Sequence, residues 1–416
     1  MKRLSVFLYT DILGKKIYDE FGDVIGELKD VYVTTDDGYP RAIGYKVKKN
    51  GSIFHYEFRI INIFDHNGKI YIKTKGSREI LPRTYSYLLS ENLMDKKIVD
   101  INGKQVVRVT DLKIVEIAGE YKVVAVEAGP LARFKRVGIP TIGKVLYKAL
   151  GKDYKDKLIP WEDVESLDIK NNSLQVSESY EKISSLHPAD IADILEELDE
   201  GERKKVFESL DEDLAADTFE EIEDEYKESI IKDLSETKTA ELLENIGNDE
   251  IADLLDGLAD EEREKILLNL EREDAEEVEE LLKYEDETVG SIMSKEFISF
   301  KGNITVEETV DIIKEMEPDE DVIYCIYVID DYERINGVVN LRDLILSKPD
   351  NLLNEIMEEN VASVKYDNSI SKVIEKSSKY DLLSTPVIDD EEKLIGIVSI
   401  HDIIDEYLYP LWKKKK

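Results

Sequence analysis

Residues 186–198, LHPADIADILEEL, open a segment in which apolar residues recur with a step of twelve. In most repeats, two adjacent apolar residues are followed three positions later by a third; in one repeat the polar Thr218 replaces the first of them. The repeats are Ile194, Leu195 and Leu198; Val206, Phe207 and Leu210; Phe219 and Ile222; Ile230, Ile231 and Leu234; Leu242, Leu243 and Ile246; Leu254, Leu255 and Leu258; Ile266, Leu267 and Leu270; and a degraded copy, Val278 and Leu282. Twelve residues hold about two helical turns and a short connector. Helices that short are unstable alone in water, so the segment is predicted to be a superhelical stack that buries their apolar edges.

Most of the net charge of the chain lies in this segment. The 416 residues carry 93 Asp and Glu against 56 Lys and Arg, a net charge of −37. Between residues 190 and 287 there are 40 acidic residues and 10 basic ones. Because phosphate binding needs a basic face, we expect no nucleic-acid partner. The charge favours cations or basic partners instead.

Cysteine and histidine are too sparse for a disulfide framework or a zinc cluster. Cys325 is the single cysteine and lies in an apolar run, which predicts a buried core thiol. The N-terminus has no signal peptide, and no apolar run approaches the roughly 18 residues of a membrane span. We therefore expect a soluble, cytoplasmic protein.

Residues 1–180 contain a second, longer repeat with a step of 81. Residues 13–19 resemble residues 94–100, and residues 30–33 match residues 111–114. Alternation of period two between glycine turns predicts two small antiparallel β-barrels, at 1–90 and 91–180. The closing segment IPWEDV, residues 159–164, resembles the PRC-barrel family. These barrels are mostly adaptor modules, so the resemblance implies no active site.

A basic insertion, residues 131–157, interrupts the second copy. One interpretation is a surface helix packed on the barrel. The alternative is an amphipathic contact with an anionic membrane surface, at the inner face of the membrane, which the four C-terminal lysines 413–416 would share.

The helical segment, 184–287, resembles the cytosolic N domain of the MgtE magnesium transporters. The resemblance rests on the Leu-His-Pro-Ala-Asp opening at 186–190, on the twelve-residue repeats, and on the exit YEDETVGSIM at 284–293. Residues 288–348 and 349–410 continue it as a pair of CBS domains. Each copy carries Gly, two apolar residues, Asn or Ser, two further residues and Asp, at 337–343 and 396–402. The expected fold is thus a multidomain α+β protein with two β-barrels, an all-α superhelix and an α/β CBS pair.

The CBS resemblance implies adenine-nucleotide binding, with ATP, ADP or AMP as ligand. Asp402, and less strongly Asp343, would accept the ribose hydroxyls, with Ser399 as the preceding hydroxyl residue. Thr385 and Pro386 would line the adenine cleft. The alternative is that both aspartates only cap helices in an unoccupied fold.

The MgtE resemblance also implies Mg²⁺. In that family, acidic residues of the N domain and the CBS pair face one another and bind Mg²⁺, which closes the assembly. Mg²⁺ takes few carboxylates and keeps several waters, so no spacing identifies its ligands. We take as candidates four acids of the CBS pair and three of the helical segment; any of them is alternatively an ordinary solvated carboxylate. They are Asp319, Glu320, Asp381 and Asp405, and Glu223, Asp224 and Glu225.

No phosphate loop, nucleophile elbow or catalytic triad is present in the sequence, so we expect no enzyme. The membrane pore of the family would follow the CBS pair, where this sequence ends in four lysines. We therefore expect a regulatory sensor of Mg²⁺ and adenine nucleotide, homodimeric through its CBS pair. Its partner would be a separately encoded divalent-cation transporter. The alternative is a non-catalytic scaffold with unoccupied CBS sites.

Overall fold

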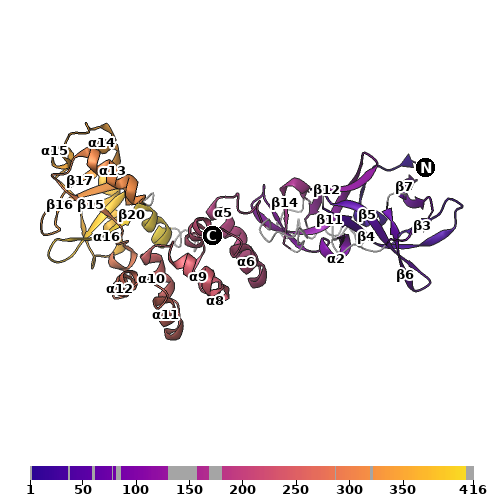
Figure 1. Ribbon diagram of the computed structural model, residues 1–416, viewed down its shortest axis with the longest axis horizontal. Helices are drawn as coiled ribbons and strands as arrows, with labels where there is room; N and C mark the ends of the chain where they lie inside the picture. The colour runs from indigo at the N-terminus through magenta and orange to yellow at the C-terminus, as the bar shows by residue number, and fades with distance from the viewer. Residues whose placement is uncertain are drawn as a thin grey trace, which may run out of the picture. The chain divides into compact units, whose positions relative to one another are not determined.

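The computed structural model describes residues 2–35, 38–58, 61–76, 78–80, 86–129, 157–167, 180–285, 287–318 and 322–408. The basic insertion up to residue 156 and the C-terminal lysines lie outside the described residues. The chain forms two compact units, Met1–Leu234 and Ser235–Lys416, and each is described by itself (Figure 1). No helix among the described residues is long and apolar enough to span a membrane.

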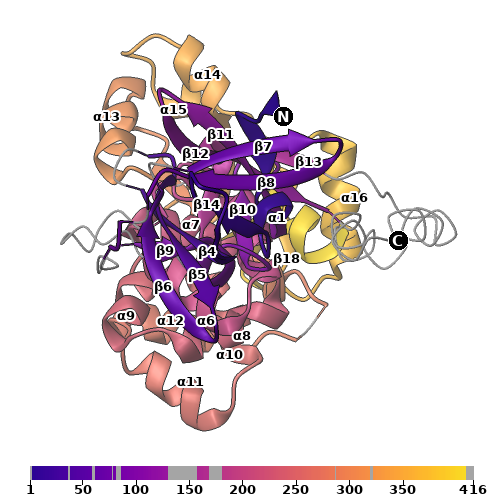
Figure 2. The same ribbon diagram turned by 90° about the vertical axis from the view of Figure 1, so that its right-hand side faces the viewer.

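The two barrel copies of the first unit share one 14-stranded sheet. Together with the helices that follow, this sheet confirms the predicted α+β class. Over the described residues this sheet is not closed into two separate barrels. Its long strands are antiparallel neighbours, with β7 beside β8 in Figure 2. The elements of copy one are β1 (Lys2–Arg3), β2 (Val6–Leu8), α1 (Tyr9–Ile12), β3 (Lys16–Tyr18), β4 (Val24–Thr34), β5 (Arg41–Lys49), β6 (Ser52–Glu57), β7 (Ile61–His66) and β8 (Lys69–Thr74). At the repeat step of 81 residues, β2 corresponds to β9, so copy two begins at Tyr87 and not at the predicted residue 91. The elements of copy two are β9 (Tyr87–Leu88), α2 (Leu89–Asn92), β10 (Lys97–Asp100), β11 (Gln105–Ile117), β12 (Glu120–Ala128), β13 (Lys157–Pro160), the 3-10 turn η2 (Trp161–Asp163) and β14 (Val164–Ser166).

The two copies are joined because a strand near the beginning of each copy pairs with a strand of the other copy. Strand β2 of copy one pairs with β11 of copy two, and β9 of copy two pairs with β4 of copy one. Two buried aspartates at equivalent repeat positions hold the exchanged helices. Asp30 accepts hydrogen bonds from the Tyr9 hydroxyl at 2.6 Å and from the Ser90 amide at 3.0 Å. Asp111 accepts one from the Thr10 amide at 3.1 Å, and burial raises the pKa of its carboxyl group.

Each twelve-residue repeat forms one short helix. The helices are α5 (Pro188–Glu197), α6 (Glu200–Phe207), α7 (Glu212–Glu220) and α8 (Asp224–Asp233) in the first unit, and α9 (Glu236–Leu243), α10 (Asn248–Asp256), α11 (Asp260–Leu267) and α12 (Arg272–Leu281) in the second. Alternate helices contact one another, as in α5 with α7, α6 with α8 and α10 with α12. The apolar positions that define the repeat are mostly buried in these contacts.

The CBS pair forms two similar three-stranded sheets, each with one parallel and one antiparallel pairing. Helices α13 to α16 lie around these sheets in Figure 1. The first copy contains β15 (Ile298–Lys301), α13 (Val306–Met316), β16 (Cys325–Ile329), β17 (Ile335–Asn340) and α14 (Leu341–Leu346). The second contains α15 (Leu353–Ile356), β18 (Val364–Lys365), α16 (Ile370–Tyr380), β19 (Ser384–Ile388), β20 (Leu394–Ser399) and α17 (Ile400–Asp402), followed by the π-helical turn Ile403–Leu408.

Candidate functional site

The predicted ribose-binding aspartate, Asp402, lies where β20 ends and α17 begins. Its carboxylate accepts a hydrogen bond from the Ser399 amide at 2.7 Å and another from the Ser399 hydroxyl at 2.8 Å. The Ser399 hydroxyl in turn accepts one from the Asp402 amide at 3.1 Å, which completes a capping box. These hydrogen bonds fix the carboxylate of Asp402 at the start of the helix. The cap is present, and ribose binding by Asp402 stays a prediction.

The equivalent aspartate of the first CBS copy, Asp343, has different surroundings. Asn340 stands in the place of Ser399 and makes no side-chain cap; its Oδ1 accepts instead from the Cys325 thiol at 3.6 Å. The Asp343 carboxylate is paired with the Arg342 guanidinium at 2.9 Å. The two predicted ribose-binding aspartates therefore have chemically different surroundings.

Two other predicted cleft residues are used within the fold. Thr385 is fully buried, and its hydroxyl is 2.8 Å from the hydroxyl of Ser377 on α16. Pro386 pairs with Ile397 in the β19–β20 ladder. The Thr385 side chain thus anchors the strand to α16. Burial raises the pKa of the Cys325 thiol to about 11, which suits the core residue predicted from its apolar run.

An aspartate that the sequence did not single out, Asp249, belongs to the same neighbourhood. It lies in the first turn of α10, one of the acidic helices, and is half-buried. Its pKa is raised well above the ordinary value, first by burial and then by the negative charges of Asp402, Glu250 and Glu296. Within the second unit, the negative charge of Asp402 therefore acts on an acid of the helical segment. Nothing in the acidic repeat marks Asp249 among its neighbours, so only the packing could identify it.

The seven predicted Mg²⁺ ligands remain predictions. Asp319 and Glu320 lie outside the described residues, as does the side chain of Asp405. Asp381 is exposed and ends α16 in the left-handed conformation. Among the described residues, no three His, Cys, Asp or Glu side chains are placed to hold a metal ion together.

The three acids predicted in the helical segment belong to the first unit, at the start of α8. Glu223 is the N-cap residue of that helix, and its amide donates to Glu196 at 3.0 Å. Asp224 forms an ion pair with Lys227 at 3.7 Å, while Glu225 is exposed. The described contacts of these acids are those of an ordinary helix start.

A cavity of about 580 Å³ lies in the barrel region, where β12 meets β5. Both arginines in its lining pair with glutamates of the same lining, Arg41 with Glu120 at 3.1 Å and Arg78 with Glu57 at 3.8 Å. Because the positive and negative side chains of the lining largely neutralise one another, the cavity does not identify a class of ligand.

Three family models match the chain. The MgtE intracellular N domain matches residues 186–287, the CBS domain matches 289–349 and 353–409, and the PRC-barrel domain matches 5–78. The magnesium transporter MgtE of Enterococcus faecalis is 41% identical over 127 residues, and that of Thermus thermophilus is 37% identical over 127 residues. Each match covers 30% of this chain and 28% of the transporter, so the chain spans little more than a quarter of these relatives' length.

Two solved structures extend the likeness. The cytosolic domain of the Mg²⁺ channel MgtE in complex with ATP is 31% identical, with a TM-score of 0.52, over 54% of this chain and 92% of that one. The soluble part of a magnesium transporter is 34% identical, with a TM-score of 0.52, over 56% of this chain and 92% of that one. With its N domain and CBS pair matched along nearly the whole of these structures, and a PRC-barrel region before them, the chain belongs to the MgtE family through its cytosolic domain.

Proposed function

We propose that this chain is a regulatory protein that responds to Mg²⁺ and adenine nucleotide through the contact between its acidic helices and its CBS pair. The observation that supports the proposal is the raised pKa of Asp249, to which burial contributes most and the negative charge of Asp402 next. A carboxyl group whose pKa is raised by burial and by like charge is held in an unfavourable place at neutral pH. A cation relieves both penalties, so Mg²⁺ would stabilise this contact.

The donor chemistry fits Mg²⁺. Carboxylate oxygens are its preferred protein ligands, and one or two of them suffice because the ion keeps several of its waters. Asp249 and Asp402 would hold the hydrated ion, with Glu250 and Glu296 adding negative charge. In the absence of the ion, repulsion among these groups would weaken the contact.

We propose that adenine nucleotide binds at the same place, through Asp402. The ribose would bind to its carboxylate, while the phosphates would be repelled by the surrounding acids unless a cation intervened. Since Asp402 serves both ligands, Mg²⁺ and nucleotide would each alter the affinity for the other. One of the solved structures that the chain resembles is an MgtE cytosolic domain in complex with ATP. We propose a divalent-cation transporter as the regulated partner, because two curated proteins that match 30% of this chain are magnesium transporters.

Small-angle scattering tests the Mg²⁺ response. Addition of millimolar MgCl2 to the whole chain should lower its radius of gyration more than NaCl of the same ionic strength does. Asp249→Asn should reduce this difference, because it removes the charge that the ion relieves. Asp256→Asn, at an exposed position of the same helix, is the matched control and should respond like the original chain. An unchanged radius at every Mg²⁺ concentration would refute the sensor and favour a scaffold.

A further inference from the structure

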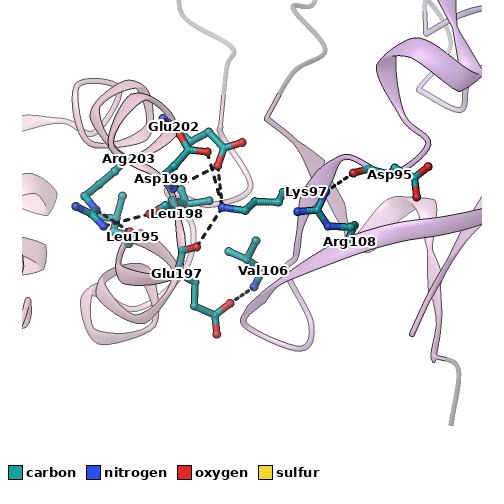
Figure 3. A network of polar contacts seen from close by, with 10 residues as sticks. All are labelled: Asp95, Lys97, Val106, Arg108, Leu195, Glu197, Leu198, Asp199, Glu202 and Arg203. Atoms are coloured by element: carbon teal, nitrogen blue, oxygen red, sulfur yellow. Dashed lines mark hydrogen bonds and ion pairs between the residues drawn. The ribbon is translucent and has the colours of Figure 1, made fainter. Parts of the chain in front are cut away.

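The second barrel copy contacts the first two acidic helices through Lys97 and Lys104, and Figure 3 shows the contacts of Lys97. The Lys97 ammonium of β10 lies 3.3 Å from the Glu202 carboxylate and 3.8 Å from that of Asp199, and it donates to the carbonyl oxygen of Glu197 at 3.5 Å. Lys104, in the turn between β10 and β11, pairs with Asp190 of α5 at 2.5 Å. Lys97, Glu202 and Asp190 are each less than one-third exposed. Solvent therefore screens these pairs less than it screens fully exposed ones.

Lys97 compensates a crowded pair of carboxylates. Asp199 and Glu202 form the capping box of α6, so the two acids face each other across the start of that helix. Burial raises the pKa of Glu202, and the neighbouring Asp199 raises it further, whereas the charge of Lys97 opposes the shift. Without Lys97, only the more weakly acting Lys205 would offset the two negative charges at the start of α6.

A backbone contact accompanies the ion pairs. Pairing between β11 and β12 begins at Val109, so the outer edge of β11 before that residue has no β12 neighbour. There the Val106 amide donates to the Glu197 carboxylate at 2.8 Å. Figure 3 shows Glu197, at the end of α5, pointing toward this edge. An exposed strand edge is a natural place for a partner to attach, and a helix side chain caps it here.

The segment that leads into the helices is attached to the same barrel copy. The Lys182 ammonium donates to the carbonyl oxygens of Glu162 at 2.9 Å and Val164 at 2.8 Å. These residues belong to η2 and β14, which follow the basic insertion in copy two. This attachment uses none of the carboxylates bound by Lys97 and Lys104. Two separate sets of contacts thus join the helical segment to copy two.

Copy one has only one of the two lysines that make these contacts. At the repeat step of 81 residues, Lys97 corresponds to Lys16, whereas Lys104 corresponds to Asp23. An aspartate at that turn would repel Asp190 where the lysine attracts it. The difference between the copies selects copy two for the acidic helices.

We propose that the second barrel copy is a docking module for the N-terminal helices of an MgtE-type N domain, here α5 and α6 of the same chain. The dock is electrostatic, so it weakens as ionic strength rises. It gives the barrel region a role that neither the Mg²⁺ response nor nucleotide binding requires. Its residues are distinct from Asp249 and Asp402, so either proposal can fail without the other.

Hydrogen exchange at the Val106 amide in the whole chain tests the dock. Lys97→Glu should speed exchange there by about threefold or more, because loss of the pair and new repulsion open the contact. Glu202→Lys added to Lys97→Glu should restore slow exchange. Lys16→Glu, at the equivalent position of copy one, should leave Val106 unchanged. Amides in the β12 ladder should stay protected in every variant, which separates undocking from unfolding.

A second pair tests the same dock independently. Lys104→Glu should also accelerate exchange at Val106, and Asp190→Lys should reverse the effect. Unchanged exchange in both Lys97→Glu and Lys104→Glu would overturn the proposal, as would failure of both charge-restoring partners. The Mg²⁺ scattering response of Lys97→Glu should persist, since its proposed residues lie elsewhere in the chain.

Discussion

At the scale of single residues, the two CBS aspartates should differ in nucleotide binding. Asp402 is held at the helix start by hydrogen bonds from Ser399, whereas the Asp343 carboxylate is paired with the Arg342 guanidinium. Titration calorimetry with ATP, ADP and AMP should therefore detect binding that Asp402→Ala removes and Asp343→Ala largely retains. Asp402→Asn keeps a capping acceptor, and it checks that the loss is not caused by a frayed helix start. Absence of heat from all three nucleotides would mean that the site does not bind them.

Asp249 should give the second unit a characteristic pH dependence without Mg²⁺. Its folded pKa lies above the ordinary value of 3.8, so the folded state binds this proton more tightly than the unfolded state does. The resulting stability is fully present below pH 3.8 and is lost as pH rises through the raised pKa. In chelator, the contribution of this residue to the melting temperature should thus grow as pH falls from neutrality.

The Asn variant isolates that contribution. Asp249→Asn should melt a few degrees higher than the original chain at neutral pH, since about 1 kcal/mol moves the melting temperature of a domain of this size by about 2–4 °C. The difference should shrink on acidification, when Asp249 itself becomes neutral. Asp256→Asn, on the exposed side of the same helix, should show neither effect. A lower melting temperature for Asp249→Asn at neutral pH would contradict the inferred repulsion.

Sequence reasoning reached Asp402 and Ser399 because a local motif carries them. A strand that ends at a hydroxyl residue three positions before an aspartate predicts a helix start, and the capping box confirms that geometry. Asp249 could not be predicted from the sequence, because the charges that raise its pKa include those of Glu296 and Asp402, about 45 and 150 positions away. No local sequence pattern distinguishes Asp249 from the other acidic residues among the 40 of the helical segment.

At the scale of elements, the sequence predicted the helices closely. The eight helices begin at positions separated by twelve residues, from Pro188 to Arg272. The apolar pattern sets that step, and capping residues reinforce it: Asp199, Asp211 and Ser235 each cap a helix at the same repeat position. The apolar period and the capping residues predict the same helix boundaries, so these boundaries depend little on tertiary packing.

The exchange between the barrel copies could not be predicted in the same way. The 81-residue repeat makes the two first segments alike, so each could pair within its own copy or with the other. Asp30 and Asp111 would offer the same hydrogen-bond acceptors in either arrangement. The choice depends on how the connecting chain runs in space, which no local pattern records. Similarly, the difference between Lys104 and Asp23 acquired meaning only once the structure placed copy two beside Asp190.

At the scale of the whole molecule, we expect the chain to form a homodimer through its CBS pair. Of the 15 large hydrophobic side chains that are exposed among the described residues, 8 lie between Met316 and Leu408. Ile345 and Leu346 at the end of α14 are each about two-thirds exposed or more, at 70% and 68%. Burial of such side chains favours association by about 25 cal/mol per Å² of apolar surface. Light scattering of the eluted protein should give twice the chain mass of 47.8 kDa.

Leu346→Asp should weaken that dimer, because a charge cannot be buried in an apolar interface without a partner. The matched control is Leu268→Asp, at an 84% exposed position between α11 and α12. It introduces the same charge outside the CBS pair and should leave the mass unchanged. Dilution should dissociate the Leu346→Asp protein at concentrations where the control remains dimeric. If the original chain has the mass of one copy at every concentration, the exposed residues of α14 have another role, and regulation occurs within a single chain.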